Sequence, residues 1–203
     1  MFYETSKPSP LQPDPFKSIV VPRPVGWIST VDKAGIVNLA PFSFYNGVAE
    51  HPPMVMFSAG GSYGESPAKH SLLNARATGE FVVNMVSEKL KEAMNATAAM
   101  VAMGVDEMKL AGLQPAPCLL VKPPRVAASP VALECKVWKI VDLPGDGSDV
   151  AYAVVIGSVV GIHIDESIVK DGRIDTLAFR PVARLGYSEY TTVDNVWRMR
   201  RPG

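Results

Sequence analysis

Cysteine and histidine are scarce in this chain, which holds only two cysteines and three histidines among its 203 residues. Cys118 and Cys135 form no CxxC pair, and the histidines at positions 51, 70 and 163 are widely separated. Structural zinc and haem-attachment sites use closely spaced Cys and His ligands, so we expect no metal site. Both cysteines are expected to be structural.

An excess of charge of one sign is also absent, as are long apolar runs. Lys and Arg total 20 and Asp and Glu total 20, so the formal net charge is zero. That balance argues against a protein that binds nucleic acid or an anionic membrane through bulk charge. No apolar run reaches the ~18 residues of a membrane helix, and the N-terminal sequence MFYETSKPSPLQPDPF has no secretory signal core. We expect a soluble, cytoplasmic protein.

Proline, by contrast, is abundant: the 18 prolines punctuate the whole chain. They disfavour a helical bundle and favour short strands joined by turns. Four of them in residues 1–17 predict an extended arm. β-branched and apolar patterns predict strands at 18–24 (an edge strand), 25–31, 36–46, 54–59, 81–86, 131–141 and 150–164. Helical spacing predicts helices at 68–77 and 87–99.

Short local signals mark the turns and helix ends. Asp32–Gly35 (DKAG) predicts a hairpin turn, and residues 145–149 (GDGSD) predict another. Ser66 is expected to cap the first helix and Gly79 to end it. Because strands and helices do not alternate regularly, a doubly wound parallel sheet is disfavoured. A mainly β fold with inserted helices, an antiparallel barrel closed or partly closed, fits better.

The glycine-rich segment before the first predicted helix is one candidate site. Its polar side chains are Ser62, Ser66, Lys69, His70 and Ser71. Backbone N–H groups, hydroxyls and one ammonium group in a first helical turn suit a phosphate, although a solvated loop has the same composition. Ser66 and Lys69 also spell SxxK, the nucleophile motif of penicillin-recognising enzymes. A helix-capping Ser and a Lys near a helix start explain the pattern more simply, and the SDN and KTG partner motifs are absent.

A second candidate region, residues 23–58, mixes aromatic rings with hydroxyl and amide groups. Strands with this alternation can hold a flat heteroaromatic ligand, with stacking below and hydrogen bonds at its rim. A barrel core with polar outward faces has the same pattern. The pattern alone leaves both interpretations open.

Several segments resemble, in order, the flavin reductase-like family of FMN-binding split barrels. They are RPVGWIST (23–30), NLAPFSFYNGVAEHPPMVMFS (38–58), KHSLLN (69–74), GEFVVNMV (79–86), SPVALEC (129–135), IGSVVGIHIDE (156–166) and FRPVARLGYSEY (179–190). The family includes flavoredoxin and the reductase components of two-component flavin monooxygenases. The resemblance implies a homodimer of antiparallel Greek-key split barrels, with an arm at 1–17, the barrel domain at 18–190 and a tail at 191–203.

The resemblance also implies which residues bind non-covalent FMN near the subunit interface. Ser29 and Thr30 would face the flavin, with Trp27 close to it. Residues Ser43, Phe44, Tyr45 and Asn46 would follow the ring and ribityl chain, and Ser58, Ser62, Lys69, His70 and Ser71 would surround the phosphate. Relatives often carry Lys-Asp-Thr where this chain has Lys69-His70-Ser71. We expect FMN binding to be retained, and the loss of that carboxylate leaves FMN affinity and its pH dependence open. His51 and His70 are expected at the surface.

The function that the resemblance implies is an NAD(P)H-dependent flavin reductase. No protein residue is expected to be catalytic, because the flavin itself carries the chemistry. NADH or NADPH would be the electron donor, and a partner flavin-dependent monooxygenase or another acceptor would receive reduced flavin or electrons. The alternative is a flavoredoxin-like electron carrier with no NAD(P)H turnover of its own.

Overall fold

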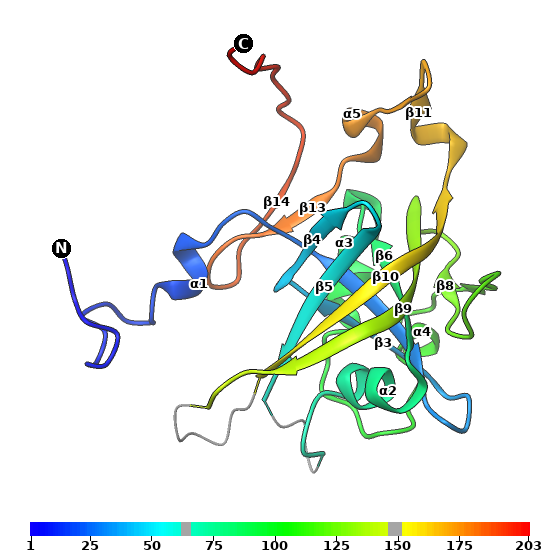
Figure 1. The fold of residues 1–203 in the computed structure, drawn as a ribbon, viewed down its shortest axis with the longest axis horizontal. Coiled ribbons are helices and arrows are strands. Elements are labelled where there is room, and N and C mark those ends of the chain that lie inside the picture. Colours follow the sequence, from blue (N-terminus) through cyan, green and yellow to red (C-terminus); the bar gives the residue numbers. More distant parts are fainter. Residues whose placement is uncertain (62–65, 146–151) are drawn as a thin grey trace.

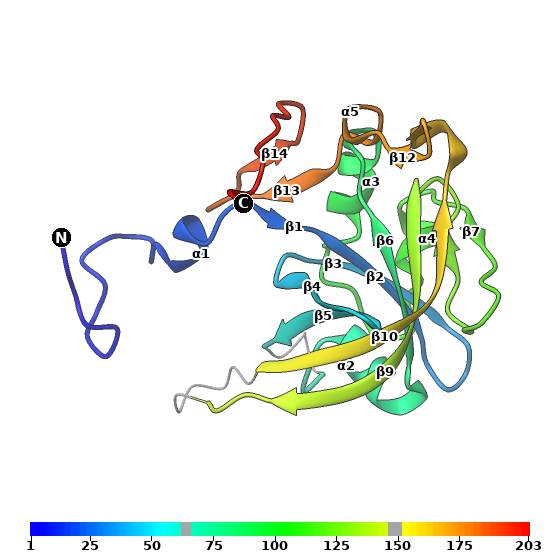
Figure 2. The same cartoon turned by 45° about the horizontal axis from the view of Figure 1, so that its top comes forward.

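Seven antiparallel strands form the body of the protein in the computed structural model, which describes residues 1–61, 66–145 and 152–203. Their order in the sheet is β3-β2-β6-β9-β10-β5-β4. The bounds are β2 (Gly26–Val31), β3 (Val37–Phe42), β4 (Tyr45–Glu50), β5 (Pro53–Gly60), β6 (Glu80–Met85), β9 (Val131–Asp142) and β10 (Tyr152–Ile164). The sheet curls into a barrel that is split between β3 and β4, the two edge strands (Figures 1 and 2). The predicted mainly β, antiparallel barrel class is confirmed.

The predicted hairpin at Asp32–Gly35 joins β2 to β3. One carboxylate oxygen of Asp32 accepts hydrogen bonds from the N–H groups of Ala34 and Ile36, both at 2.8 Å. Gly35 has a φ of +85°, a conformation that glycine adopts without a steric penalty. The turn therefore follows from its own four residues. The predicted turn at 145–149 falls almost wholly outside the described residues.

The single strand predicted at 36–46 is wrong, because the chain bends at Ser43 and Phe44 and forms two strands there. β3 pairs with β2 at one edge of the sheet, whereas β4 pairs with β5 at the other. The chain has to leave one edge and join the other. The carbonyl of Phe44 accepts a hydrogen bond from the Ser58 N–H at 2.7 Å, which anchors the bend to β5.

Helix α2 (His70–Thr78) lies across one end of the barrel and contributes Leu72 and Ala75 to its core (Figure 1). Lys69 is its N-cap residue, so the predicted cap at Ser66 is wrong; Ser66 precedes the helix. Because the helix begins only at His70, Ser66 and Lys69 are not joined by a helical turn, as the nucleophile and lysine of an SxxK motif would be. Gly79 ends the helix as predicted, in a left-handed conformation with φ of +73°.

The helix predicted at 87–99 is shorter and divided. A 3-10 turn, η1 (Glu88–Leu90), precedes α3 (Lys91–Ala96). The hydroxyl of Thr97 donates to the carbonyl of Met94 at 2.8 Å and accepts from the indole N–H of Trp27, also at 2.8 Å. The helix thus stops where the Thr97 side chain turns back onto it and joins the core.

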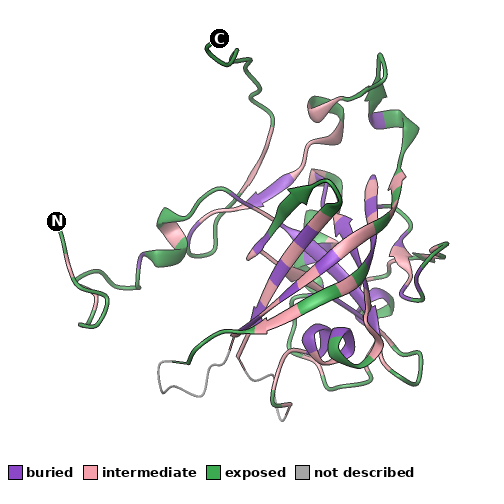
Figure 3. Cartoon of the chain, viewed as in Figure 1, coloured by how far each residue is buried: buried purple, intermediate pink, exposed green. Residues whose placement is uncertain are grey.

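Among the described residues, buried apolar side chains form three clusters, of which two are large, and Figure 3 shows the buried residues in purple. Inside the barrel, Phe57 and Phe81 pack edge to face with ring centroids 5.3 Å apart. A Cβ atom at Gly157 would lie 2.5 Å from the Phe81 ring, so glycine is needed there. The second cluster includes Trp27 of β2, Leu39 of β3 and Met94 of α3. Strand β2 therefore has a core on both of its faces.

Short elements surround the barrel, and both chain ends extend from it (Figures 1 and 2). They are α1 (Phe16–Ile19), β1 (Arg23–Pro24), α4 (Glu107–Leu110), β7 (Pro115–Ala116), β8 (Arg125–Val126), η2 (Glu166–Ile168), β11 (Val169–Lys170), β12 (Arg173–Ile174), α5 (Thr176–Phe179), β13 (Val182–Arg184) and β14 (Tyr190–Thr192). β1, β13 and β14 form a small sheet beside the barrel. Among the described helices, none has the length and apolar character needed to cross a membrane.

Candidate functional site

An open groove of about 250 Å³ lies beside the bend that joins β3 to β4. Its flat walls include Phe42, Phe44 and Tyr152. A Cβ atom at Gly60 would lie 2.2 Å from the Tyr152 ring, so the glycine makes room for that ring in the wall. A smaller cavity of about 90 Å³ continues from the groove, and both are lined by Pro41, Phe42 and Lys69. The two cavities form one site with an aromatic part and a polar part.

Four cationic side chains line the groove: Lys17, Arg23, Lys69 and Arg184. Arg23 is buried, with 7% of its surface exposed, and burial followed by the charge of Arg184 lowers the pKa of its guanidinium. Its nitrogens donate to the backbone carbonyls of residues 17, 20 and 185 and to the Ser43 hydroxyl. Arg23 therefore joins the N-terminal segment, the small sheet and the bend at one wall of the groove.

Lys69 stands between the groove and the smaller cavity, at the start of α2. Burial lowers the pKa of its ammonium group, which means that partial desolvation disfavours the charge. An anion bound beside it would favour the charged form again. Ser71, one helical position beyond His70, lines the smaller cavity, and its hydroxyl forms a 2.8 Å hydrogen bond with the side-chain amide of Asn38.

His70 is buried, with 7% of its surface exposed, so the surface position predicted for it is wrong. The helix directs its ring inward, where Nε2 lies 3.2 Å from the hydroxyl oxygen of Ser66. Burial, and after it the charge of Lys69, lowers the pKa of His70. His51, in contrast, is exposed as predicted.

The smaller cavity also contains a carboxylate that the sequence did not point to. Glu107 of α4 is 3% exposed, and one of its oxygens accepts a hydrogen bond from the N–H of Leu39 at 2.9 Å. Burial raises the pKa of this carboxyl group. No local motif in the sequence marked Glu107.

The structure brings half of the predicted site residues together around the two cavities: Ser43, Phe44, Ser58, Lys69, His70 and Ser71. Asn46 lies exposed on the edge strand β4, apart from both cavities. Tyr45 is buried, and burial raises the pKa of its phenol, whose oxygen lies 3.7 Å from the sulfur of Met85. Ser62 lies outside the described residues.

The predicted residues of β2 lie inside the protein instead of along the groove. Ser29 and Thr30 have no exposed surface; the Ser29 hydroxyl donates to the carbonyl of Pro124 at 2.6 Å, and the Thr30 hydroxyl accepts from the amide of Asn74 at 3.1 Å. Trp27 is likewise fully buried. Arg23, Arg184 and Tyr152 line the groove without having been predicted. Arg23 and Arg184 lie in the segments RPVGWIST and FRPVARLGYSEY that carry the family resemblance, whereas no sequence signal marked Tyr152.

The fold and this groove define a split-barrel protein with a cationic, aromatic-walled groove. Residues 18–182 match the model of the flavin reductase-like domain, and the chain belongs to that family. The barrel is similar to nitrilotriacetate monooxygenase component B from Bacillus cereus (TM-score 0.89, 30% identity, 98% of each chain covered). It is also similar to the 2-nitrobenzoate 2-nitroreductase NbaA from Pseudomonas fluorescens (TM-score 0.83, 26% identity, 100% of this chain and 96% of that chain).

A curated relative from Halalkalibacterium halodurans, described as an uncharacterized protein, is 38% identical over 183 residues, which cover 90% of this chain and 87% of that protein. The family assignment thus rests on sequence and on structure, and the expected resemblance is confirmed.

Proposed function

We propose that the protein binds FMN non-covalently in the groove, with the flat ring system against the aromatic wall and the phosphate near Lys69. The observation that supports this most directly is the junction of the two cavities at Lys69, where an aromatic-walled groove meets a polar pocket. FMN has the matching division into a flat apolar ring and an anionic phosphate. Two cavities of about 250 and 90 Å³ are at the small end of the range for ligand sites, in keeping with a site completed by a second subunit.

The polar pocket suits a phosphate through its charge and its hydrogen-bond donors. The ammonium of Lys69 supplies a cation, and the first N–H groups of α2 supply donors. The Glu107 carboxylate opposes an anion, but burial has already raised its pKa, so the approach of a phosphate favours its neutral form. The chain therefore offers a carboxyl group near the phosphate even though His70 replaces the usual Asp.

The proposed activity is reduction of flavin by NADH or NADPH. When bound, FMN supplies a ring that accepts a hydride. The side chains of the groove then have three tasks: to hold the ring through Phe44 and Tyr152, to balance its charge through Arg23 and Arg184, and to leave one face open to the donor. The name of the Bacillus cereus relative supports a partner flavin-dependent monooxygenase as the consumer of reduced flavin.

A homodimer is part of the proposal. The N-terminal segment and the C-terminal residues carry exposed apolar side chains, among them Phe2, Phe16 and Trp197. Apolar surface on extended chain ends is typical of segments that pack on a neighbouring subunit. Lys17, next to Phe16 on α1, lines the groove, so a second subunit that packs on the N-terminal segment would lie near the flavin.

Two measurements in sequence test the proposed function. The first is the absorption spectrum of the protein after incubation with FMN and desalting, in which flavin bands near ~375 and ~450 nm are expected to persist. The second is anaerobic addition of NADH or NADPH, expected to bleach the 450 nm band with at least one donor. Bleaching by neither donor, with flavin retained, would identify an electron carrier instead. Absence of retained flavin together with absence of turnover of free FMN would refute the proposal.

A further inference from the structure

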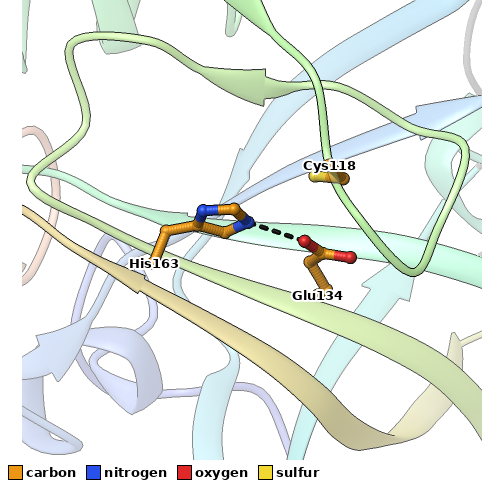
Figure 4. Close-up of side chains that lie close together, drawn as sticks. All are labelled: Cys118, Glu134 and His163. Carbon is orange, nitrogen blue, oxygen red and sulfur yellow. Dashed lines mark hydrogen bonds and ion pairs between the residues drawn. The ribbon is translucent and has the colours of Figure 1, made fainter.

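A cluster of three metal-ligating side chains lies on the outer side of the barrel, among residues that the FMN groove does not use. Glu134 comes from β9, His163 from the neighbouring strand β10, and Cys118 from the loop between β7 and β8 (Figure 4). One ligand atom from each, Sγ, a carboxylate oxygen and an imidazole nitrogen, lies within 4.8 Å of the other two. No metal site was expected from the sequence, because these residues are far apart along the chain; the fold brings them together.

The Glu134 carboxylate is held in place from several sides. Its side chain is 1% exposed, and its oxygens accept hydrogen bonds from the N–H groups of Leu119 at 2.8 Å and Leu120 at 2.6 Å. His163 Nε2 lies 2.6 Å from one of the same oxygens. Burial raises the pKa of this carboxyl group, but the hydrogen bonds from Leu119, His163 and Leu120 outweigh burial and leave the pKa below its usual value. The group is therefore a buried, preoriented anion.

We propose that Cys118, Glu134 and His163 bind one divalent transition-metal ion of the zinc class, with water as the fourth ligand. Sulfur, imidazole nitrogen and carboxylate oxygen form the mixed donor set that zinc accepts and that magnesium and calcium do not. A thiolate and a carboxylate together carry two negative charges, which balance a divalent cation, while the imidazole is neutral. A site with no net charge is the arrangement that costs least in a buried position.

Binding replaces protons by the metal, and the protons balance as follows. The Cys118 thiol releases its proton to solvent and becomes a thiolate, and the proton on His163 Nε2 leaves that atom as the neutral ring adopts the tautomer protonated at Nδ1. Without metal, burial and then the charge of Glu134 raise the pKa of the Cys118 thiol to about 11. The charge of Arg125 and a hydrogen bond from its backbone N–H favour the thiolate.

The geometry requires only small movements. Tetrahedral zinc with ligand bonds of about 2.0–2.3 Å places its ligand atoms about 3.3–3.7 Å apart. The ligand atoms of the three residues lie within 4.8 Å of one another, and the closest contact, 2.6 Å between Nε2 and the carboxylate, has to open by about 1 Å. The His163 side chain is 24% exposed and lines an open polar cavity of about 470 Å³, which gives an ion and its water ligand access from solvent.

The ion would fasten a long loop to the barrel. Cys118 belongs to the segment 117–124, and the carbonyl of its last residue, Pro124, accepts a hydrogen bond from the Ser29 hydroxyl at 2.6 Å. Glu134 already tethers the loop through two backbone N–H groups. A metal at this position has a structural role separate from the flavin, so flavin binding and metal binding are independent in this proposal.

The test uses tag-free protein that has been treated with a chelator, dialysed and then titrated with Zn²⁺. Wild-type protein is expected to bind one equivalent, and X-ray absorption at the zinc edge is expected to show one sulfur neighbour at about 2.3 Å with nitrogen or oxygen neighbours at about 2.0–2.1 Å. Cys118→Ser is expected to lose the sulfur neighbour, whereas Cys135→Ala, which removes the other thiol, keeps it. His163→Ala is expected to weaken binding at least ~100-fold, beyond the effect of losing an outer-shell partner.

Matched controls separate loss of a ligand from loss of folding. His51→Ala removes an exposed imidazole and is expected to leave zinc affinity unchanged. Circular dichroism of each variant establishes that it is folded before titration. The proposal is overturned if wild-type protein binds no stoichiometric Zn²⁺ at micromolar concentration, if no sulfur neighbour is seen, or if the sulfur neighbour persists in Cys118→Ser.

Discussion

Replacing Lys69 by alanine tests the position of the phosphate in the proposed FMN site. The ammonium of Lys69 is partly desolvated, and a hydrogen bond between a charged donor and a phosphate contributes about 1.5–3 kcal/mol. Because Lys69 is only half-buried, solvent screening places the expected loss toward the lower end, about 1.5–2 kcal/mol. This corresponds to an increase in the Kd for FMN of about 10–30-fold. Riboflavin has the same ring and no phosphate, so its Kd should change about twofold or less.

Quenching of flavin fluorescence measures both dissociation constants for wild type and variant. Lys17→Ala is the matched control: Lys17 lines the same groove but is exposed on α1, and its removal should change the Kd for FMN about twofold at most. Equal losses of FMN and riboflavin affinity in Lys69→Ala would refute the reasoning. That result would mean that Lys69 supports the shape of the groove and does not contact the phosphate.

Three other perturbations follow from the structure. Burial, and then the charge of Lys69, lowers the pKa of His70 in the free protein, and a bound phosphate raises that pKa. FMN affinity should therefore increase as the pH falls from 8 toward 6, and it should increase more than riboflavin affinity does. His70→Asn should remove this difference between the two ligands in fluorescence titrations. Glu134→Ala leaves two backbone N–H groups without their acceptor, so it should lower the free energy of unfolding, measured in urea titrations, by about 2–4 kcal/mol. Glu134→Gln keeps one acceptor oxygen and should lower the free energy of unfolding by about half as much. Gly157→Ala places a Cβ atom 2.5 Å from the Phe81 ring and should lower the free energy of unfolding by about 1–3 kcal/mol. At Gly47 an added Cβ atom meets no atom within 4 Å, so Gly47→Ala should leave stability nearly unchanged. Equal melting temperatures for these two variants would contradict the packing argument.

Local signals predicted the parts of the fold that depend on a few neighbouring residues. The hairpin at Asp32–Gly35 and the helix end at Gly79 are determined by hydrogen bonds and backbone conformations within a single turn. The strand predicted at 36–46 failed for a non-local reason. The sequence of residues 36–46 does not indicate that β3 and β4 lie at opposite edges of one sheet, because that depends on the order of all seven strands.

In the candidate site, too, the features that depend on the packing of distant elements could not be predicted from the sequence. Alternation of side chains along a strand identifies a buried face only when the other face is exposed. All six residues of β2 are buried, since one face packs in the barrel and the other against α3 and α4, so the pattern could not tell whether Ser29 and Thr30 face a ligand or the interior. Arg184 reaches the groove only through the pairing of β13 with β1, and no sequence signal marks that pairing.

The smaller cavity shows how the substitution of His70 for the usual Asp fits the structure. A carboxyl group is still present near the proposed phosphate position, because Glu107 supplies one from α4 and accepts a hydrogen bond from the N–H of Leu39. The two titratable groups respond to an anion in the same direction: a phosphate raises the pKa of His70 toward its charged form and raises that of Glu107 toward its neutral form. Both changes take up protons and make the pocket more positive. Phosphate binding at this site should therefore be coupled to proton uptake.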